Sequence, residues 1–403
     1  MASLLSVAEA LERVLGHAAP LPAEEVPLAE AAGLVLAYPV KARRTQPPAD
    51  VSAMDGYAVR ASDVAKVPVR LKIVGEVAAG RPFAQPVEAG EAARIFTGGV
   101  MPEGADAVVI QEHAKRDGNH VNVEKSSSQG RHVRARGLDF KIGDALFAAG
   151  HRLTARDLAL AAGMNHPRLP VHRRPKVALF ATGDELVPAG TEPGPGQIVS
   201  SNNFALEALA RGEGADVEDL GIVGDRLDDT VAAVRRAREG GADILVTSGG
   251  ASVGDYDLVQ KAFAAEGMEL SFWRLALRPG RPLMHGRLGD MHVLGVPGNP
   301  VSAFVCGFLF LAPLIRRLSG RTDLTRTIES AMLGCDLPEN DERADYLRAT
   351  LSDGPQGPVA TPFPIQDSSM MAPLAKADCL VIREPYEPAA TVGSRCRIVK
   401  FEH

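Results

Sequence analysis

Between residues 176 and 318 the chain alternates short apolar runs with segments of helical periodicity, and each apolar run leads into a turn before the next helix. This order is typical of parallel sheets, because parallel strands need a crossover connection that is usually a helix. We therefore expect one α/β domain over residues 171–322. The pattern predicts strands at 177–181, 216–222, 243–247 and 269–276, helices at 203–211, 228–239 and 257–265, a hairpin over 282–296 and a long apolar helix over 300–318.

The remaining chain is expected to form further domains, because 403 residues exceed what one hydrophobic core usually holds. Short β-like runs broken by Gly and Pro, such as 69–77 and 107–111, predict an inserted β-rich domain over 49–142. The flanking segments 21–48 and 143–170 should build one small linking domain together. Alternating strands and Pro-Gly turns predict a C-terminal β barrel over 323–403, and a helix over 3–18 should pack on the α/β domain.

Composition and charge exclude several classes of partner. The net charge of −6 and the pI near 6.0 argue against nucleic-acid binding, which normally needs a basic face. The four cysteines lie far apart without metal-ligand spacing, so neither a zinc site nor a disulfide framework is expected, and a reducing cytosol fits best. The N-terminus lacks a basic signal-peptide region and the longest apolar run, 300–315, is short for a bilayer, so we predict a cytoplasmic protein without membrane contact.

Three turns are expected at the carboxyl ends of strands, where ligands of open parallel sheets bind. They cover residues 181–185, 247–257 and 295–302. In the second turn, Gly249 and Gly250 let backbone amides approach an anion, and Ser248 and Ser252 add hydroxyl groups, which suits a phosphate. The glycine spacing matches neither the dinucleotide fingerprint nor the P-loop, so a plain turn remains an alternative.

Acidic side chains gather in and beside the same turns. Carboxylates at successive strand ends can hold Mg²⁺ through oxygens and water. The alternative for Asp225 and Asp257 is that each caps the helix that follows it. The acids are Asp184, Glu185, Asp225, Asp255 and Asp257.

Arg274, Arg278 and Arg281 form a local basic cluster in an otherwise acidic chain. On an extended strand the first two would share one face, and guanidinium groups bind phosphates and oxyanions bidentately. Solvated surface arginines are the alternative.

The β-rich insertion offers isolated candidates as well. Asp55 precedes a Gly turn, Thr97 opens a second turn, and Asp139 ends the segment Arg136-Gly-Leu-Asp. Each acid has a structural alternative, because Asp before Gly commonly stabilises its own turn and Asp139 can pair with nearby arginines.

Together these segments resemble the molybdopterin molybdotransferases, the MoeA family, which includes the E domain of gephyrin and its plant counterpart. The resemblance covers essentially the whole chain. Its motifs stand in order at 53–58 (AMDGYA), 97–98 (TG), 136–139 (RGLD), 182–186 (TGDEL), 248–257 (SGGASVGDYD), 278–282 (RPGRP) and 295–300 (GVPGNP).

The resemblance implies an L-shaped, four-domain subunit with a MogA-like α/β domain, and a homodimer whose cleft is shared between subunits. It implies molybdenum insertion into adenylylated molybdopterin, with molybdate and Mg²⁺, giving molybdenum cofactor and AMP. It also implies contact with the adenylyltransferase and with cofactor-accepting molybdoenzymes. Carried over, the catalytic positions are Asp55, Thr97, Asp139, Glu185, Asp225, Asp257, Arg274 and Arg278. The metal ligands are Asp184, Glu185, Asp225 and Asp257, and the substrate-binding positions are Thr182, Gly183, Ser248, Gly249, Gly250, Ser252, Gly254, Arg281, Pro297, Gly298, Asn299 and Pro300.

The chain departs from the family pattern mainly in which positively charged residue it uses. Many members carry lysine where it has Arg274, Arg278 and Arg281. Arginine cannot give up its proton at ordinary pH, so anion binding is favoured over acid-base chemistry. Leu138 also stands where an acid is common, and Ala251 where Val is common. Two rival functions remain: the adenylyltransferase that makes the activated pterin, and a scaffold that keeps the fold without catalysis.

Overall fold

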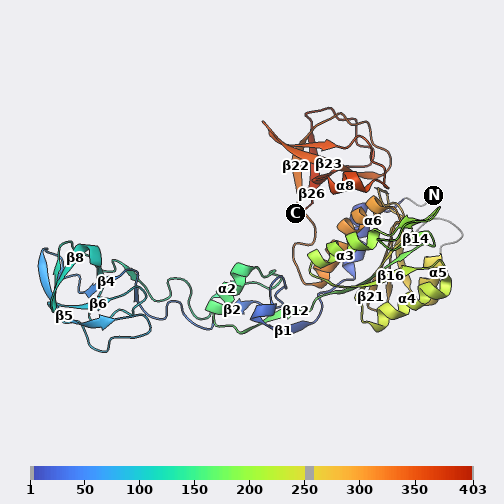
Figure 1. Cartoon of the computed structure of the whole chain (residues 1–403). Helices are drawn as coiled ribbons and strands as arrows, with labels where there is room; N and C mark the ends of the chain where they lie inside the picture. The colour runs from blue at the N-terminus through green and yellow to red at the C-terminus, as the bar shows by residue number, and fades with distance from the viewer. Residues whose placement is uncertain (1–3, 250–257, 402–403) are drawn as a thin grey trace.

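Four packed units follow one another along an elongated molecule in the computed structural model, which describes residues 4–249 and 258–401. Figure 1 shows the β-rich insertion at one end, the small linking unit in the middle, and the α/β unit with the C-terminal barrel at the other end. This architecture is the multidomain α/β and β fold expected from the sequence.

The α/β unit is built on a six-stranded sheet in the order β16-β13-β17-β21-β20-β18. The first four strands run parallel, and β20 and β18 continue the sheet antiparallel. The predicted strands and the predicted hairpin are thereby confirmed, apart from the end of β18. The strands are β13 (Lys176–Thr182), β16 (Asp216–Val223), β17 (Ile244–Ser248), β18 (Glu269–Trp273), β20 (Met284–Leu288) and β21 (Met291–Val296).

Helices cover both faces of this sheet, because alternate residues of its buried strands point to opposite sides. In β13, Val177 and Leu179 pack beneath α1, α3 and α6, whereas Ala178 and Phe180 pack beneath α4 and α5. The helices are α1 (Val7–Gly16), α3 (Asn202–Gly212), α4 (Leu227–Glu239), α5 (Leu258–Ala265), α6 (Pro300–Cys306), the π-helical turn η3 (Gly307–Leu311) and α7 (Ala312–Leu318).

Two helix predictions need adjustment. The first helix begins at Val7, where Ser6 and Glu9 form a capping box, and it ends at Gly16, so it is shorter than the predicted 3–18. The long apolar helix runs through the π-helical turn without interruption. Its segment Pro300–Leu318 has the length and composition of a membrane span, but 83% of it is buried inside the protein, as in a core helix.

The strand predicted over 269–276 is wrong at its end. β18 stops at Trp273, and Arg274 has a φ of 91°, which turns the chain away from the sheet. The following β19 (Leu277–Arg278) pairs with β23 of the barrel instead. The expectation that Arg274 and Arg278 share one strand face is therefore also wrong.

Both chain segments that flank the insertion contribute to the linking unit. Its core combines Val40 and Ala42 with Phe140, Phe147 and Leu153. The elements are β1 (Ala23–Pro27), η1 (Leu28–Glu30), β2 (Val40–Lys41), β11 (Ala145–Phe147), α2 (Ala155–Gly163) and β12 (Arg168–His172).

The insertion holds a six-stranded sheet in the order β7-β4-β6-β5-β9-β8 and a small β3–β10 pair. The inner strand β4 is buried throughout, β9 alternates buried and half-buried residues, and the side chains form apolar clusters separate from those of the other units. The elements are β3 (Val51–Ser52), β4 (Gly56–Val59), β5 (Val69–Val77), β6 (Glu91–Ile95), β7 (Ala107–Ile110), η2 (Gln111–His113), β8 (Ala114–Asp117), β9 (His120–Val123) and β10 (Val133–Arg134).

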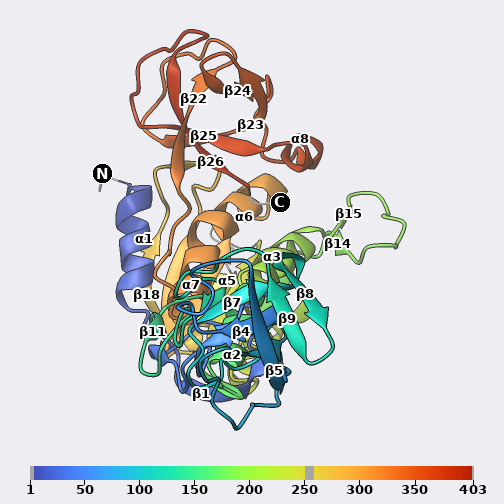
Figure 2. The same cartoon turned by 90° about the vertical axis from the view of Figure 1, so that its left-hand side faces the viewer.

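The C-terminal unit is a five-stranded barrel that closes through pairing of β23 with β25. Val301, Val305 and Phe308 of the long helix pack against Leu380 and Val399 of the barrel, so an apolar contact joins the barrel to the α/β unit. Figure 2 shows the barrel seated above this helix. The elements are β22 (Ile328–Leu333), β23 (Ala344–Gly354), β24 (Gly357–Pro362), α8 (Met371–Ala375), β25 (Cys379–Arg383) and β26 (Arg395–Lys400).

A buried carboxylate holds the segment that leads from the long helix into the barrel. Glu213, just after α3, accepts hydrogen bonds from Arg316 at 2.7 and 2.8 Å, from Arg321 at 3.0 Å and from Arg326 at 3.0 Å. Glu213 is 5% exposed, so the charges attract one another with little screening by water.

Glu213→Ala is expected to lower the free energy of unfolding by about 3–5 kcal/mol, because buried guanidinium groups lose their counter-charge. The matched control is Glu207→Ala, which removes the more exposed pair with Arg211 on the same helix and should cost about 0.5 kcal/mol or less. Denaturant unfolding of both variants measures the difference, and equal losses would contradict the assignment.

A second buried polar pair, His285 and His292, lies on neighbouring strands β20 and β21. Their Nε2 and Nδ1 atoms are 3.4 Å apart, and both residues are almost fully buried. Burial, together with neighbouring positive charge, lowers the pKa of His285 to about 3 and that of His292 to about 4. Both rings are therefore neutral in the folded protein near neutral pH.

Because both folded pKa values lie below the ordinary 6.5, their contribution to stability is present above pH 6.5 and is lost as the pH falls toward about 4. Each ring is expected to contribute about 1.4 kcal/mol per pH unit in that window. His285→Phe should remove about half of the slope of the unfolding free energy against pH that the two histidines cause together. Unfolding free energies of parent and variant between pH 6.5 and pH 5 test this, and parallel curves would contradict it.

Candidate active site

A cleft of about 950 Å³ lies at the carboxyl ends of β13, β17 and β21 and extends to the barrel. The strands bring these residues together because they are parallel and in register: Ala181 pairs with Ser248, and Ser248 pairs with Val296. The predicted site residues that border the cleft are Thr182, Gly183, Glu185, Asp225, Ser248, Gly249, Pro297, Gly298, Asn299 and Pro300.

Two acids of the cleft edge are bound to each other's backbone. The Asp225 amide donates to the Asp184 carboxylate at 3.0 Å, and the Asp184 amide donates to the Asp225 carboxylate at 3.4 Å. Thr182 also donates to Asp225 at 3.3 Å. Helix α4 begins after Arg226 without a side-chain cap, so the alternative interpretation of Asp225 as a helix cap is wrong. These hydrogen bonds link the turn that carries Asp184 to the turn that carries Asp225. Asp225 and Glu185 border the cavity.

The described part of the chain contains no group of three or more acidic, His or Cys side chains arranged to hold a metal ion. Glu185, Asp225 and Asp184 supply oxygen ligands of the kind that Mg²⁺ prefers. Five predicted residues, Gly250, Ser252, Gly254, Asp255 and Asp257, lie outside the described residues.

Glycine is required where the second turn leaves β17. Gly249 has a φ of +92°, and a Cβ there would lie 2.5 Å from the carbonyl oxygen of Thr182. Neighbouring Ser248 is almost fully buried and donates to Asn203 at 3.5 Å. Gly249 itself borders the cleft, and its backbone amide donates to the Val296 carbonyl at 3.2 Å.

The three arginines have different environments, and none borders the cleft among its described lining residues. The Arg274 guanidinium lies over the Trp273 ring at 5.1 Å, and its buried Nε has no hydrogen-bond partner among the described residues. Arg281 is exposed.

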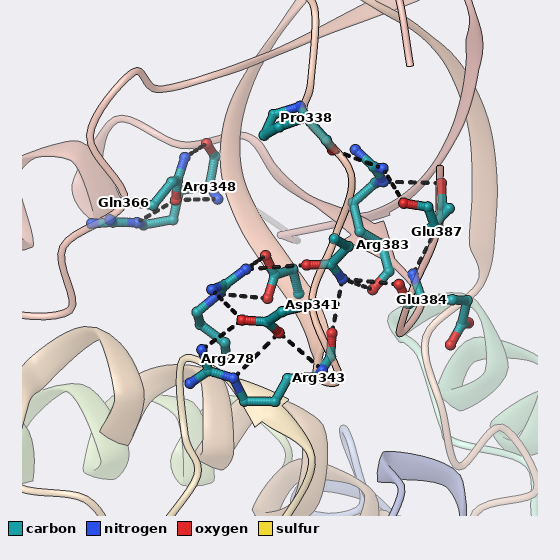
Figure 3. Close-up of polar contacts among 11 residues, drawn as sticks. Arg278, Pro338, Asp341, Arg343, Arg348, Gln366, Arg383, Glu384 and Glu387 are labelled. Atoms are coloured by element: carbon teal, nitrogen blue, oxygen red, sulfur yellow. Dashed lines mark hydrogen bonds and ion pairs between the residues drawn. The ribbon is translucent and has the colours of Figure 1, made fainter. Parts of the chain in front are cut away.

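Arg278 is bound by the barrel. Its guanidinium donates to Asp345 through two nitrogens, to Asp341 at 2.9 Å and to Asn340 at 3.1 Å (Figure 3). The hydrogen bond to Asp345 raises the pKa of Arg278. Arg278 thus joins the α/β unit to the barrel.

Asp55 precedes β4 and Thr97 follows β6, two strands of the β-rich insertion, which lies at the end of the molecule away from the α/β unit (Figure 1). Asp139 adjoins Phe140 in the core of the linking unit. The Asp55 carboxylate accepts bonds from the backbone amide of Thr97 at 2.7 Å and from its hydroxyl at 2.8 Å. These bonds lower the pKa of Asp55 and keep it ionised. Asp139 is exposed.

Sequence reasoning missed the part of the cleft that other segments supply. The short strands β14 (Leu186–Val187) and β15 (Ile198–Val199) border it, as do Ser201 and Asn202 at the start of α3. Ser369 and Met371 reach it from the barrel. The start of α3 could have been found as another turn beside a strand, but no sequence signal links residues near 370 to this cleft.

With four units in this order, the chain is a multidomain α/β and β protein with a cleft at the carboxyl edge of its parallel sheet, bordered on one side by the barrel. Family models match three parts of it: "MoeA N-terminal region (domain I and II)" over residues 5–164, "Probable molybdopterin binding domain" over 178–317, and "MoeA C-terminal region (domain IV)" over 330–401.

Relatives named molybdopterin molybdenumtransferase include one from Nostoc, 41% identical over 74% of this chain and 70% of its own length, and one from Haemophilus influenzae, 32% identical over 95% of both chains. The crystal structure of a molybdopterin biosynthesis MoeA protein from Pyrococcus horikoshii is similar at 30% identity with a TM-score of 0.86, covering 100% of both chains. The chain belongs to the molybdopterin molybdenumtransferase (MoeA) family and is an enzyme of molybdenum-cofactor biosynthesis.

Gly249→Ala is expected to lower kcat/KM about tenfold or more, because the new Cβ forces the turn and the end of β13 apart. The matched control is Gly221→Ala in β16, where φ is +86° but a Cβ would meet no atom within 4 Å. That control should carry a similar backbone strain of about 1 kcal/mol without loss of activity. Steady-state kinetics and thermal melts separate the two effects, and equal activity loss in both variants would contradict the prediction.

Proposed function

We propose that this enzyme inserts molybdenum from molybdate into adenylylated molybdopterin with the help of Mg²⁺ and releases AMP. The observation that carries the proposal is the cleft itself. It gathers the carboxylates of Glu185 and Asp225 and the glycine turn after Ser248 around one cavity. Carboxylates that can hold a cation beside backbone that can approach a phosphate suit an adenylylated, anionic substrate.

The carboxylates of Glu185, Asp225 and Asp184 offer the oxygen donors that Mg²⁺ prefers, and they would hold the ion together with Asp257. When bound, the ion supplies charge neutralisation beside a pyrophosphate. The protein residues do the remaining work. The hydrogen bonds between the Asp184 and Asp225 turns fix the carboxylates before substrate binds. Because the Gly249 amide already donates to the Val296 carbonyl, phosphate oxygens would be received by the part of the glycine turn that follows Gly249.

Thr182, Ser248 and the 297–300 turn would bind the rest of the pterin substrate, with Gly250, Ser252 and Gly254 completing the phosphate cradle. Arg274 and Arg281 would attract molybdate or a phosphate group, since guanidinium groups remain charged and bind oxyanions. Arg278 would contribute mainly by holding the barrel, because its donors already meet Asp345, Asp341 and Asn340.

No protein nucleophile is needed for this reaction, and the residues fit that expectation. Cys306 is completely buried in the long helix, and burial raises the pKa of its thiol. A buried, protonated thiol is inert, and free buried cysteines also suit a reducing cytoplasm.

We propose further that the working enzyme is a homodimer in which Asp55, Thr97 and Asp139 of one subunit complete the cleft of the other. The support is the distance between the insertion and the cleft within one chain, together with the ionised, pre-positioned carboxylate of Asp55 (Figure 1). The adenylyltransferase and the cofactor-accepting molybdoenzymes would be its protein partners.

Glu185→Gln and Asp257→Ala are each expected to lower AMP release about 100-fold, because each removes a charge that neutralises the cation. The assay supplies adenylylated pterin, Mg²⁺ and molybdate and measures AMP. The matched control is Glu192→Gln, an exposed acid of the same 181–200 segment that does not border the cleft. Full turnover in both variants would refute the metal site, and ATP-dependent adenylylation without molybdate would favour the adenylyltransferase function.

A further inference from the structure

One wall of the cleft comes from the barrel, on a loop of residues 363–371 that runs from the end of β24 to Met371, the first residue of α8. Ser369 and Met371 border the cavity. The Ser368 carbonyl accepts a bond from the Val301 amide at 3.0 Å, and its hydroxyl accepts one from the Asn299 side chain at 2.9 Å. The loop therefore binds the same 297–300 turn that borders the other side of the cleft.

The Val301 contact also stabilises the long helix. Val301 lies in the first turn of α6, where backbone amides have no partner within the helix. The loop carbonyl satisfies one of these amides from another unit of the protein. A displaced loop would leave this amide unpaired and would open the cleft at the same time.

Inside the barrel the loop is held by one guanidinium group. Arg348 of β23 is 1% exposed and donates to the carbonyls of Met370 at 2.8 Å and Asp367 at 2.9 Å. It also donates to the Gln366 side chain at 3.2 Å. A longer bond reaches the Ile365 carbonyl at 3.5 Å, so four contacts from one planar group fix both halves of the loop relative to the strand.

The Gln366 side chain also links the loop to the strand, because it both accepts and donates hydrogen bonds with the backbone of Arg348. Its carbonyl oxygen accepts from the Arg348 amide at 3.0 Å, and its amide nitrogen donates to the Arg348 carbonyl at 2.9 Å and to the Phe363 carbonyl at 2.9 Å (Figure 3). Gln366 thus continues the pairing of β23 beyond the end of β24. Loss of these bonds would leave a buried charge and buried carbonyls unsatisfied, which costs more than the bonds contribute.

The strand that carries Arg348 is itself fixed to the α/β unit. Asp345, three residues earlier on β23, binds Arg278 of the short strand β19, which pairs in parallel with the start of β23. Segment 277–282 leads from that contact to Pro282, which borders the cleft. β23 therefore connects two cleft-lining segments, one through Asp345 and one through Arg348.

We propose that Arg348 and Gln366 are positioning residues that set the barrel-side wall of the cleft and, through it, the affinity for the pterin substrate. Neither residue borders the cavity, so they act through Ser369 and Met371. The kinetic part of this proposal rests on the proposed function, whereas the structural part concerns the order of the loop and does not.

The test compares Arg348→Lys and Gln366→Ala with the parent enzyme. Lysine keeps the charge of Arg348 but lacks the planar fork that spans the loop carbonyls. The matched control is Arg383→Lys: Arg383 is 3% exposed in the same barrel and donates to the carbonyls of Pro338, Glu387 and Pro388, away from the cleft (Figure 3). Arg348→Lys and Arg383→Lys each alter the contacts of a buried barrel arginine with loop carbonyls, and Gln366→Ala removes the bonds from the loop to the backbone of Arg348.

Two measurements decide the outcome. In the absence of substrate, amide hydrogen exchange over residues 363–371 should rise about tenfold or more in Arg348→Lys and Gln366→Ala and stay at the parent level in Arg383→Lys. With adenylylated pterin, KM should rise about tenfold while kcat changes less than about threefold, again only in the first two variants. Gln366→Ala keeps the test decisive if Arg348→Lys fails to fold.

Unchanged exchange in the loop, or the same KM increase in Arg383→Lys, would overturn the proposal. A fall in kcat with unchanged KM would also overturn it, because that result indicates direct participation in the chemistry. If the parent enzyme shows no molybdate-dependent AMP release, the proposed function fails, and the exchange experiment still decides whether Arg348 and Gln366 order the loop.

Discussion

The parallel pairing of β13, β17 and β21 is the constraint on which the rest of the molecule depends. Parallel strands in register end at one edge, so the turns that follow them meet even though they are separated by more than a hundred residues of sequence. Glu185, Ser248 and the 297–300 turn share a cleft for this reason. The two helical layers that bury the sheet keep this edge fixed.

The barrel contributes to the cleft through polar contacts as well as apolar packing. The apolar contact between α6 and the barrel supplies attraction, but it does not by itself define one orientation. Orientation comes from directed bonds: Arg278 to Asp345, Val301 to Ser368, and the group around Glu213 that holds the connecting segment. Several arginines of this acidic chain therefore serve as internal connectors between units.

Much of the fold could be predicted from the sequence, because apolar runs and helical periodicity are local patterns that indicate strands and helices directly. The predicted strands at 177–181 and 216–222 and the helix at 228–239 agree with the structure within a residue or so. Burial on both sheet faces gives β13 an unbroken apolar run, and burial on one side gives α4 its helical periodicity. The prediction failed after Trp273. Leu275 and Ala276 suit a strand, but after the positive φ of Arg274 the chain leaves the sheet: Leu275 bridges to Leu5, and the next residues, Leu277 and Arg278, pair with the barrel. Local periodicity contains no information about such a partner.

What the sequence determined by itself is the family, the order of the units and the chemical types at the strand ends, because motif spacing and apolar periodicity are local properties of the chain. The tertiary structure decided which of those groups share a cavity. It brought Ser369 and Met371 to the cleft, assigned Arg278 to the barrel and left Asp55 and Thr97 at the far end of the molecule. These outcomes depend on contacts between units that are distant in the sequence. Geometry and burial determine which residues meet there, and residue type alone does not.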